Sequence, residues 1–114
     1  MALYYDLGPL YREYNNDKEL VRARLIDFLL DSKKRLKKIK KGIDEKEYAK
    51  VEKHIKSLKP SLEFLGVDQA IDEANQIQEW TLDQGKTKEV KEIFKSFQMH
   101  VKNARKEIKK DFDL

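Results

Sequence analysis

Apolar residues recur about every 3.6 positions through most of this chain, which is the period of a helix with one buried face. The pattern occupies four segments separated by short polar breaks. The apolar positions are Val21, Leu25, Phe28, Leu29, Leu36 and Ile39; Tyr48, Val51, Ile55, Leu58, Leu62 and Leu65; Ile71, Ala74, Ile77 and Thr81; and Val90, Ile93, Phe94, Phe97, Val101, Ala104 and Ile108. Each segment therefore predicts one amphipathic helix.

Glycine and short polar residues mark the expected ends of these helices. The breaks are Asn15-Asn16-Asp17, Gly42, Gly66 and Gly85. Glycine just past a helix end accepts the left-handed backbone that closes the helix. Asp and Thr side chains accept hydrogen bonds from the first free N–H groups of the next helix. The expected N-caps are Asp17, Asp44, Asp68 and Thr87, and a short leading helix from Leu7 to Tyr14 is expected to be capped by Asp6.

The four helical segments predict the architecture of the chain. Short connections make successive helices antiparallel neighbours. The chain has 114 residues, the size of one ordinary domain, and its 4 glycines and 2 prolines are too few for the many turns of a sheet protein. We therefore expect residues 1–114 to form a single all-α domain, an antiparallel up-down four-helix bundle with a short extra N-terminal helix.

Composition excludes several classes of protein. The chain has no cysteine, so disulfides and Cys-ligated metals are excluded. No run approaches the roughly 20 apolar residues of a membrane span, and residues 1–10 lack the pattern of a signal peptide. Gly-rich phosphate loops, cofactor motifs and a Ser-His-Asp order are also missing. We expect a cytoplasmic protein with no metal, cofactor or membrane partner, and no enzymatic activity.

A basic run, KKRLKKIKK at residues 33–41, accompanies a net charge of +4. Such a run can bind phosphates. It can equally be the solvated face of a helix whose Leu36 and Ile39 point inward, and lysines suit a helix C-terminus. We favour the second interpretation, so nucleic acid is not the expected partner. A basic helical adaptor or nucleic-acid-binding bundle remains the alternative.

Pro60 lies inside the second long helical segment. Proline removes one backbone hydrogen bond and clashes with the preceding turn of a helix. The apolar stripe nevertheless passes from Ile55 and Leu58 to Leu62 and Leu65 without a change of phase. We therefore expect this helix to continue through Pro60 with a bend.

The run IKSLKPSLEFLG, residues 55–66, resembles the signature of histidine-phosphotransfer (HPt) domains. That signature is His, any residue, an apolar residue, Lys, Gly or Pro, Ser, and then an apolar-Gly pair. The matching residues are Leu58, Lys59, Pro60, Ser61, Leu65 and Gly66. Residues 5–7, 16–17 and 25–30 resemble the leading segment and first bundle helix of the family. The resemblance implies a four-helix bundle that serves two-component (phosphorelay) signalling by docking receiver domains of response regulators.

The phosphoacceptor position of this signature holds Lys56 instead of histidine. Imidazole relays a phosphoryl group because it is largely neutral and nucleophilic near pH 7, whereas an exposed lysine amine is protonated. The resemblance therefore implies a pseudo-phosphotransfer domain, a monomer or weak homodimer that docks a receiver domain or sensor kinase without carrying phosphate. The docking residues that it implies are Lys56, Lys59, Glu63 and Gln78, the last standing where the family often has Gln or Glu near the acceptor.

Two histidines remain as candidate acceptors. His54 is about 200° around the helix axis from Lys56, so it does not simply replace the missing acceptor. His100 lies between Phe97 and Val101 in the last helical segment. We expect both to be surface or boundary residues, and neither belongs to a recurring metal-ligand pattern. An active phosphocarrier that uses His54 or His100 stays open as an alternative.

Overall fold

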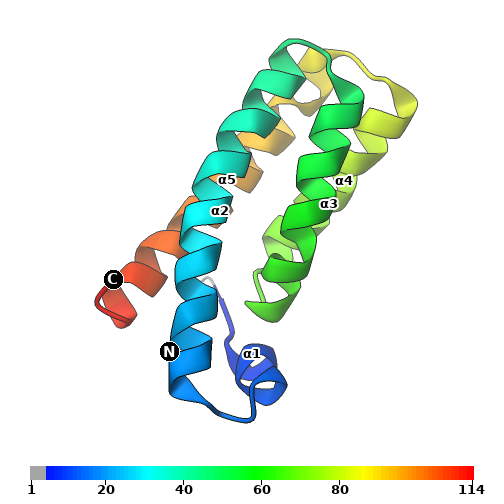
Figure 1. The fold of residues 1–114 in the computed structure, drawn as a ribbon. Coiled ribbons are helices and arrows are strands. Elements are labelled where there is room, and N and C mark those ends of the chain that lie inside the picture. The colour runs from blue at the N-terminus through cyan, green and yellow to red at the C-terminus, as the bar shows by residue number, and fades with distance from the viewer. Residues whose placement is uncertain (1–4) are drawn as a thin grey trace.

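The computed structural model describes residues 5–114 and is almost entirely helical over that range (Figure 1). Its helices are α1 (Gly8–Glu13), α2 (Lys18–Asp44), α3 (Tyr48–Phe64), α4 (Asp68–Asp83) and α5 (Thr87–Asp111). No strand occurs within residues 5–114. The prediction of an all-α protein is confirmed, and α3 continues through Pro60 as the apolar stripe predicts.

The four long helices pack against one another in a fixed set of pairs (Figure 1). Helix α2 contacts α3 and α5, and α4 contacts the same two helices, while the short α1 touches α2 and α3. The molecule measures 43 × 21 × 20 Å. With 27 residues, α2 is about 40 Å long and therefore spans nearly the whole length. No helix among residues 5–114 is both long enough and apolar enough to cross a membrane.

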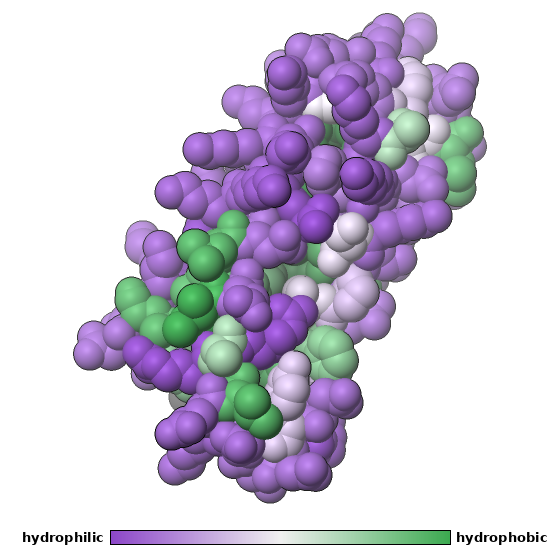
Figure 2. Space-filling model, in the orientation of Figure 1, coloured by the Kyte–Doolittle hydropathy of each residue, from purple (hydrophilic) through white to green (hydrophobic). Residues whose placement is uncertain are grey.

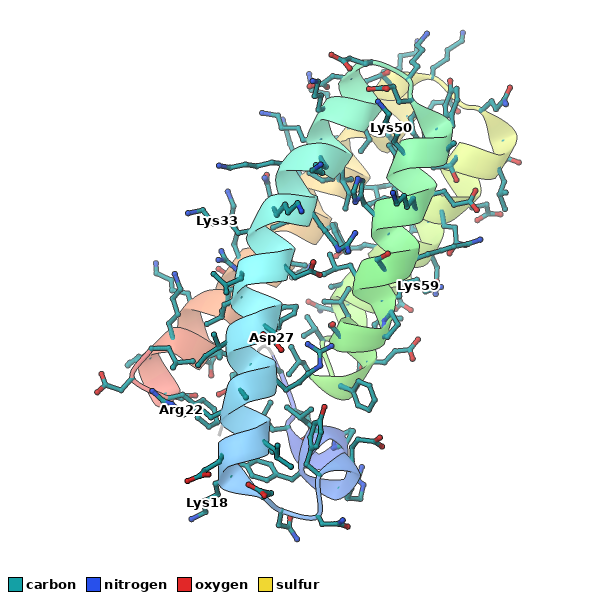
Figure 3. The ribbon with its side chains drawn as sticks, viewed as in Figure 1. Lys18, Arg22, Asp27, Lys33, Lys50 and Lys59 are labelled. Carbon is teal, nitrogen blue, oxygen red and sulfur yellow. The ribbon has the colours of Figure 1, made fainter. Side chains whose placement is uncertain are left out.

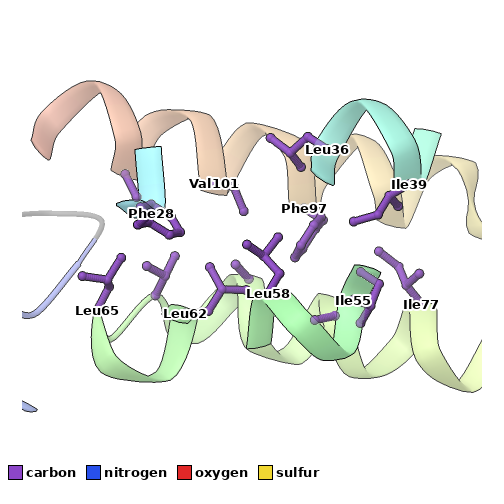
Figure 4. Packing of buried hydrophobic residues seen from close by; sticks show 14 of the residues in the cluster. Phe28, Leu36, Ile39, Ile55, Leu58, Leu62, Leu65, Ile77, Phe97 and Val101 are labelled. Carbon is purple, nitrogen blue, oxygen red and sulfur yellow. The ribbon is translucent and has the colours of Figure 1, made fainter. Parts of the chain in front are cut away.

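The predicted apolar stripes meet in one core (Figure 4). Every predicted position is buried except Tyr48, Ile71 and Ile93, which are partly buried against the same core. The core also contains residues that the stripes did not include, namely Leu10, Ile43, Val67, Ala70 and Trp80. Burial of these additional side chains closes the two ends of the core.

Only some of the predicted helix ends are correct. Asp17 caps α2, since its Oδ1 accepts from the N–H groups of Glu19 at 3.0 Å and Leu20 at 3.2 Å. The other predicted caps are wrong: Asp44 ends α2, while Asp68 and Thr87 are the first residues inside α4 and α5, after Val67 and Lys86. Asp6 accepts from the Gly8 N–H at 2.9 Å, but α1 begins at Gly8 rather than Leu7.

The break predicted at Gly42 is also wrong, because α2 continues through it to Asp44. Gly42 is buried against α3, where a Cβ would lie 2.6 Å from Cγ2 of Val51. Close packing of two helices therefore explains this glycine. Gly66, in contrast, has the left-handed backbone (φ 63°) expected just past a helix end.

Candidate functional site

The predicted docking residues of α3 form a stripe along the side of the helix next to α4. Lys56, Lys59 and Glu63 are spaced three and four residues apart, so they share one helix face. Lys59, labelled in Figure 3, donates from Nζ to Oε1 of Gln78 on α4 at 3.2 Å. The structure thus brings Lys59 and Gln78 together. We call these four residues the α3–α4 surface.

Lys56 is an exposed cation held by a neighbour on its own helix. Its Nζ lies 2.8 Å from Oε1 of Glu52, one turn earlier, and its side chain is 59% exposed. An ammonium group donates hydrogen bonds and has no lone pair for nucleophilic attack. Glu63 is also exposed. The surface therefore presents ammonium donors beside carboxylates.

His54 lies on the other side of α3 and faces α2. Its Nδ1 is 3.0 Å from Nη1 of Arg35, whose Nε lies 2.9 Å from both carboxylate oxygens of Asp31. Because a guanidinium only donates, Nδ1 of His54 accepts and carries no proton. Partial burial, and then the positive charges of Arg35 and Lys38, lower the pKa of His54. His54 is therefore neutral near pH 7, but Arg35 occupies its lone pair.

His100 joins α5 to α4. Its Nδ1 lies 2.7 Å from Oε1 of Glu73, and the two side chains are only 16% and 12% exposed. With the carboxylate accepting from Nδ1–H, Nε2 is the nitrogen left for other contacts. His100 also lines a cavity of about 260 Å³, together with Tyr5, Asp6, Gly66, Val67, Asp68 and Gln69. This histidine is a boundary residue, as predicted, with an orienting carboxylate.

Some partners of the candidate residues can be predicted from sequence spacing, and others cannot. Glu52 stands four residues before Lys56, a spacing that by itself indicates a helical ion pair. The pairs His54–Arg35 and His100–Glu73 join different helices and have no local signal. Within residues 5–114, no group of three or more His, Cys, Asp and Glu side chains is placed to hold a metal ion.

Comparison with protein-family models, with curated proteins and with solved structures finds no match to this chain. The four predicted docking residues, Lys56, Lys59, Glu63 and Gln78, share one surface of α3 and α4.

Proposed function

We propose that this protein is an HPt-like signalling domain that docks a receiver domain through the α3–α4 surface without carrying phosphate. A receiver pocket is rich in carboxylates. Lys56 places an ammonium group where the phosphoimidazole of an HPt domain would lie, and an ammonium acts as a point charge toward an aspartate or its phosphate. The protein would hold or sequester its partner in the cytoplasm, as a monomer or weak homodimer. A sensor kinase is the other partner of this class.

The observation that carries the proposal is the contact between Lys59 and Gln78, beside an exposed Lys56. Lys59 belongs to the HPt-like motif, and Gln78 stands 19 residues later on another helix. Their contact brings a residue of the motif on α3 together with the expected docking residue on α4, which supports the proposal. We also propose that the four long helices form the antiparallel up-and-down bundle of that family. The α2–α3, α3–α4, α4–α5 and α2–α5 contacts support this arrangement.

Binding to receiver domains encoded in the same genome tests the docking role. We expect one or a few receivers to bind in a calorimetric titration, and charge reversal by Lys56→Glu to weaken that binding at least tenfold. The matched control is Lys37→Glu, the same change at an exposed lysine of α2, which should leave affinity within twofold. Equal effects of the two substitutions would mean that net charge, and not the α3–α4 surface, governs binding.

Restoring the acceptor tests the family relationship. We expect the wild-type protein to take no label from a phosphorylated receiver, and Lys56→His to take label that is acid-labile. Lys59, one turn away, would then stabilise the added negative charge. An unlabelled Lys56→His protein that still folds and binds receivers would count against the HPt assignment while leaving docking intact.

A second candidate function is an active phosphocarrier that uses His100. The contact with Glu73 favours His100 over His54, because a carboxylate fixes the imidazole and leaves Nε2 unoccupied, whereas Arg35 occupies Nδ1 of His54. This candidate predicts that the wild-type protein takes acid-labile phosphate from a donor kinase. His100→Gln should abolish the label, and His54→Gln should preserve it. An unlabelled wild-type protein would eliminate this candidate.

A further inference from the structure

Helices α2 and α5 lie side by side on the part of the molecule away from the α3–α4 surface. Arg105 of α5 donates from Nη2 to the carbonyl of Leu29 at 3.1 Å, and Arg22 of α2 donates to the carbonyl of Phe112 at 2.6 Å. These two contacts fix the alignment of the helices. The outer flanks of α2 and α5 consequently form one continuous face.

Lysines from both helices gather on this face. Lys40, Lys91 and Lys95 line a shared groove of about 130 Å³, and helical spacing places the other lysines along the same two flanks. Together they define the α2–α5 basic face: Lys33, Lys37 and Lys40 from α2, and Lys91, Lys95, Lys102 and Lys109 from α5. All seven are exposed.

The seven lysines of this face outnumber the carboxylates beside them, which include Asp44 in the shared groove and Glu92. Among the described residues, its one ion pair joins Lys95 to Glu92 at 3.5 Å, and both of those side chains are mostly exposed. Helix α4, on the other side of the molecule, contains five acidic residues and no lysine or arginine. Helix α3 carries four lysines of its own, so the contrast in charge is with α4 alone, and the α2–α5 basic face attracts polyanions.

Two apolar side chains stand at the edge of the lysine rows. Leu30 is 71% exposed and Ile26 is 38% exposed, and both precede Lys33 and Lys37 on the same flank of α2 by helical spacing. Figure 2 shows hydrophobic residues gathered over the N-terminal half of α2, within a largely hydrophilic surface. Figure 3 shows Lys33 projecting from the side of α2 away from α3.

We propose that the α2–α5 basic face adsorbs to the surface of an anionic lipid bilayer. Lysines near such a surface are attracted to acidic headgroups, and shallow apolar side chains bury themselves at the acyl boundary. A nucleic acid would satisfy the lysines but leaves Leu30 and Ile26 without a role. The face is two helices wide, and the molecule is about 20 Å across. That width exceeds the roughly 12 Å of a major groove but suits a flat bilayer.

This surface is independent of the proposed receiver docking. The two surfaces lie on different sides of the molecule, so a lipid-bound protein would still present Lys56 and Lys59. The earlier expectation of no membrane partner rested on the absence of a spanning segment, and peripheral adsorption requires none. Adsorption and receiver docking can each fail without the other.

Vesicle co-sedimentation of the full chain tests the proposal. We expect binding to phosphatidylcholine vesicles that contain phosphatidylglycerol, no binding to pure phosphatidylcholine, and weaker binding as salt rises. Each neutralised lysine should cost about fivefold in partition coefficient. The triple substitution Lys33→Gln, Lys37→Gln and Lys95→Gln should therefore weaken binding roughly a hundredfold. The matched control neutralises Lys46, Lys50 and Lys53, at and near the start of α3, and should change vesicle binding less than tenfold.

Leu30→Ser separates lipid from nucleic acid. Because Leu30 is largely exposed, this change should not disturb folding, and circular dichroism verifies that. We expect it to weaken vesicle binding severalfold at a salt concentration where lysine attraction is screened. Tighter binding to duplex DNA than to anionic vesicles, with no effect of Leu30→Ser, would overturn the lipid assignment. Absence of vesicle binding at low salt would overturn the proposal that the α2–α5 basic face binds lipid. Equal effects of the two triple substitutions would overturn it too.

Discussion

Gly66 joins α3 to the N-terminal segment, and its replacement by alanine has a predictable cost. Its backbone is left-handed (φ 63°). An added Cβ would lie 2.8 Å from Cβ, 3.0 Å from the carbonyl oxygen and 3.1 Å from the nitrogen of Asp6. The Asp6 N–H donates to the carbonyl of Leu65 at 2.6 Å. The N-terminal segment therefore cannot retreat from the new methyl group without stretching this hydrogen bond.

Two effects of Gly66→Ala lower the free energy of unfolding. Left-handed backbone costs an L-residue such as alanine about 1 kcal/mol, and weakening the hydrogen bond from Asp6 costs about 1 kcal/mol more. We expect the free energy of unfolding to fall by about 2 kcal/mol. For a domain of this size, that corresponds to a melting temperature lower by roughly 8 °C.

Urea denaturation followed by far-UV circular dichroism measures this loss. The matched control is Gly8→Ala, because a Cβ on Gly8 meets only side-chain atoms of Asp6 and Arg12, at 3.2 Å and beyond. That change should stay within about 0.5 kcal/mol of the wild type. Gly66→Asn adds the same Cβ but tolerates left-handed backbone better, so it should cost less than Gly66→Ala. A Gly66→Ala protein as stable as the wild type would refute the reasoning.

Three further predictions concern the core, a histidine and the N-terminal segment. Phe97 is fully buried, so Phe97→Ala should lower the free energy of unfolding by about 3–5 kcal/mol in urea denaturation, and a smaller loss would mean a loosely packed core. The pKa of His54 is lower in the folded protein, so the unfolded chain binds a proton at this histidine more readily. The contribution of neutral His54 to the free energy of unfolding is therefore complete above pH 6.5 and is lost as the pH falls. NMR titration should place the pKa of His54 below 6.5, and Arg35→Gln should raise it; no change would remove Arg35 as a cause. Tyr5→Phe deletes the 2.5 Å hydrogen bond to Oδ2 of Asp111 and should lower the free energy of unfolding by about 1 kcal/mol in the same urea denaturation. An unchanged free energy of unfolding would mean that this contact does not stabilise the fold.

The sequence by itself determined the helices and most of the core. A helix repeats every 3.6 residues whatever surrounds it, so apolar periodicity marks the buried face of each segment before any packing is known. The same local rule predicted that α3 would pass through Pro60, because the stripe keeps its phase on both sides. Spacing along α3 also placed Lys56, Lys59 and Glu63 on one face and His54 on another.

The tertiary structure decided the helix ends and the cross-helix contacts. Gly42 resembles a break in sequence, yet it lies inside α2 because Val51 of α3 packs directly against it. The partners of His54 and His100 come from other helices, so no local pattern specifies them. The joining of the α2 and α5 lysines into one face depends in the same way on which helices become neighbours. Local periodicity fixes the direction in which a side chain points, but only packing fixes what it meets.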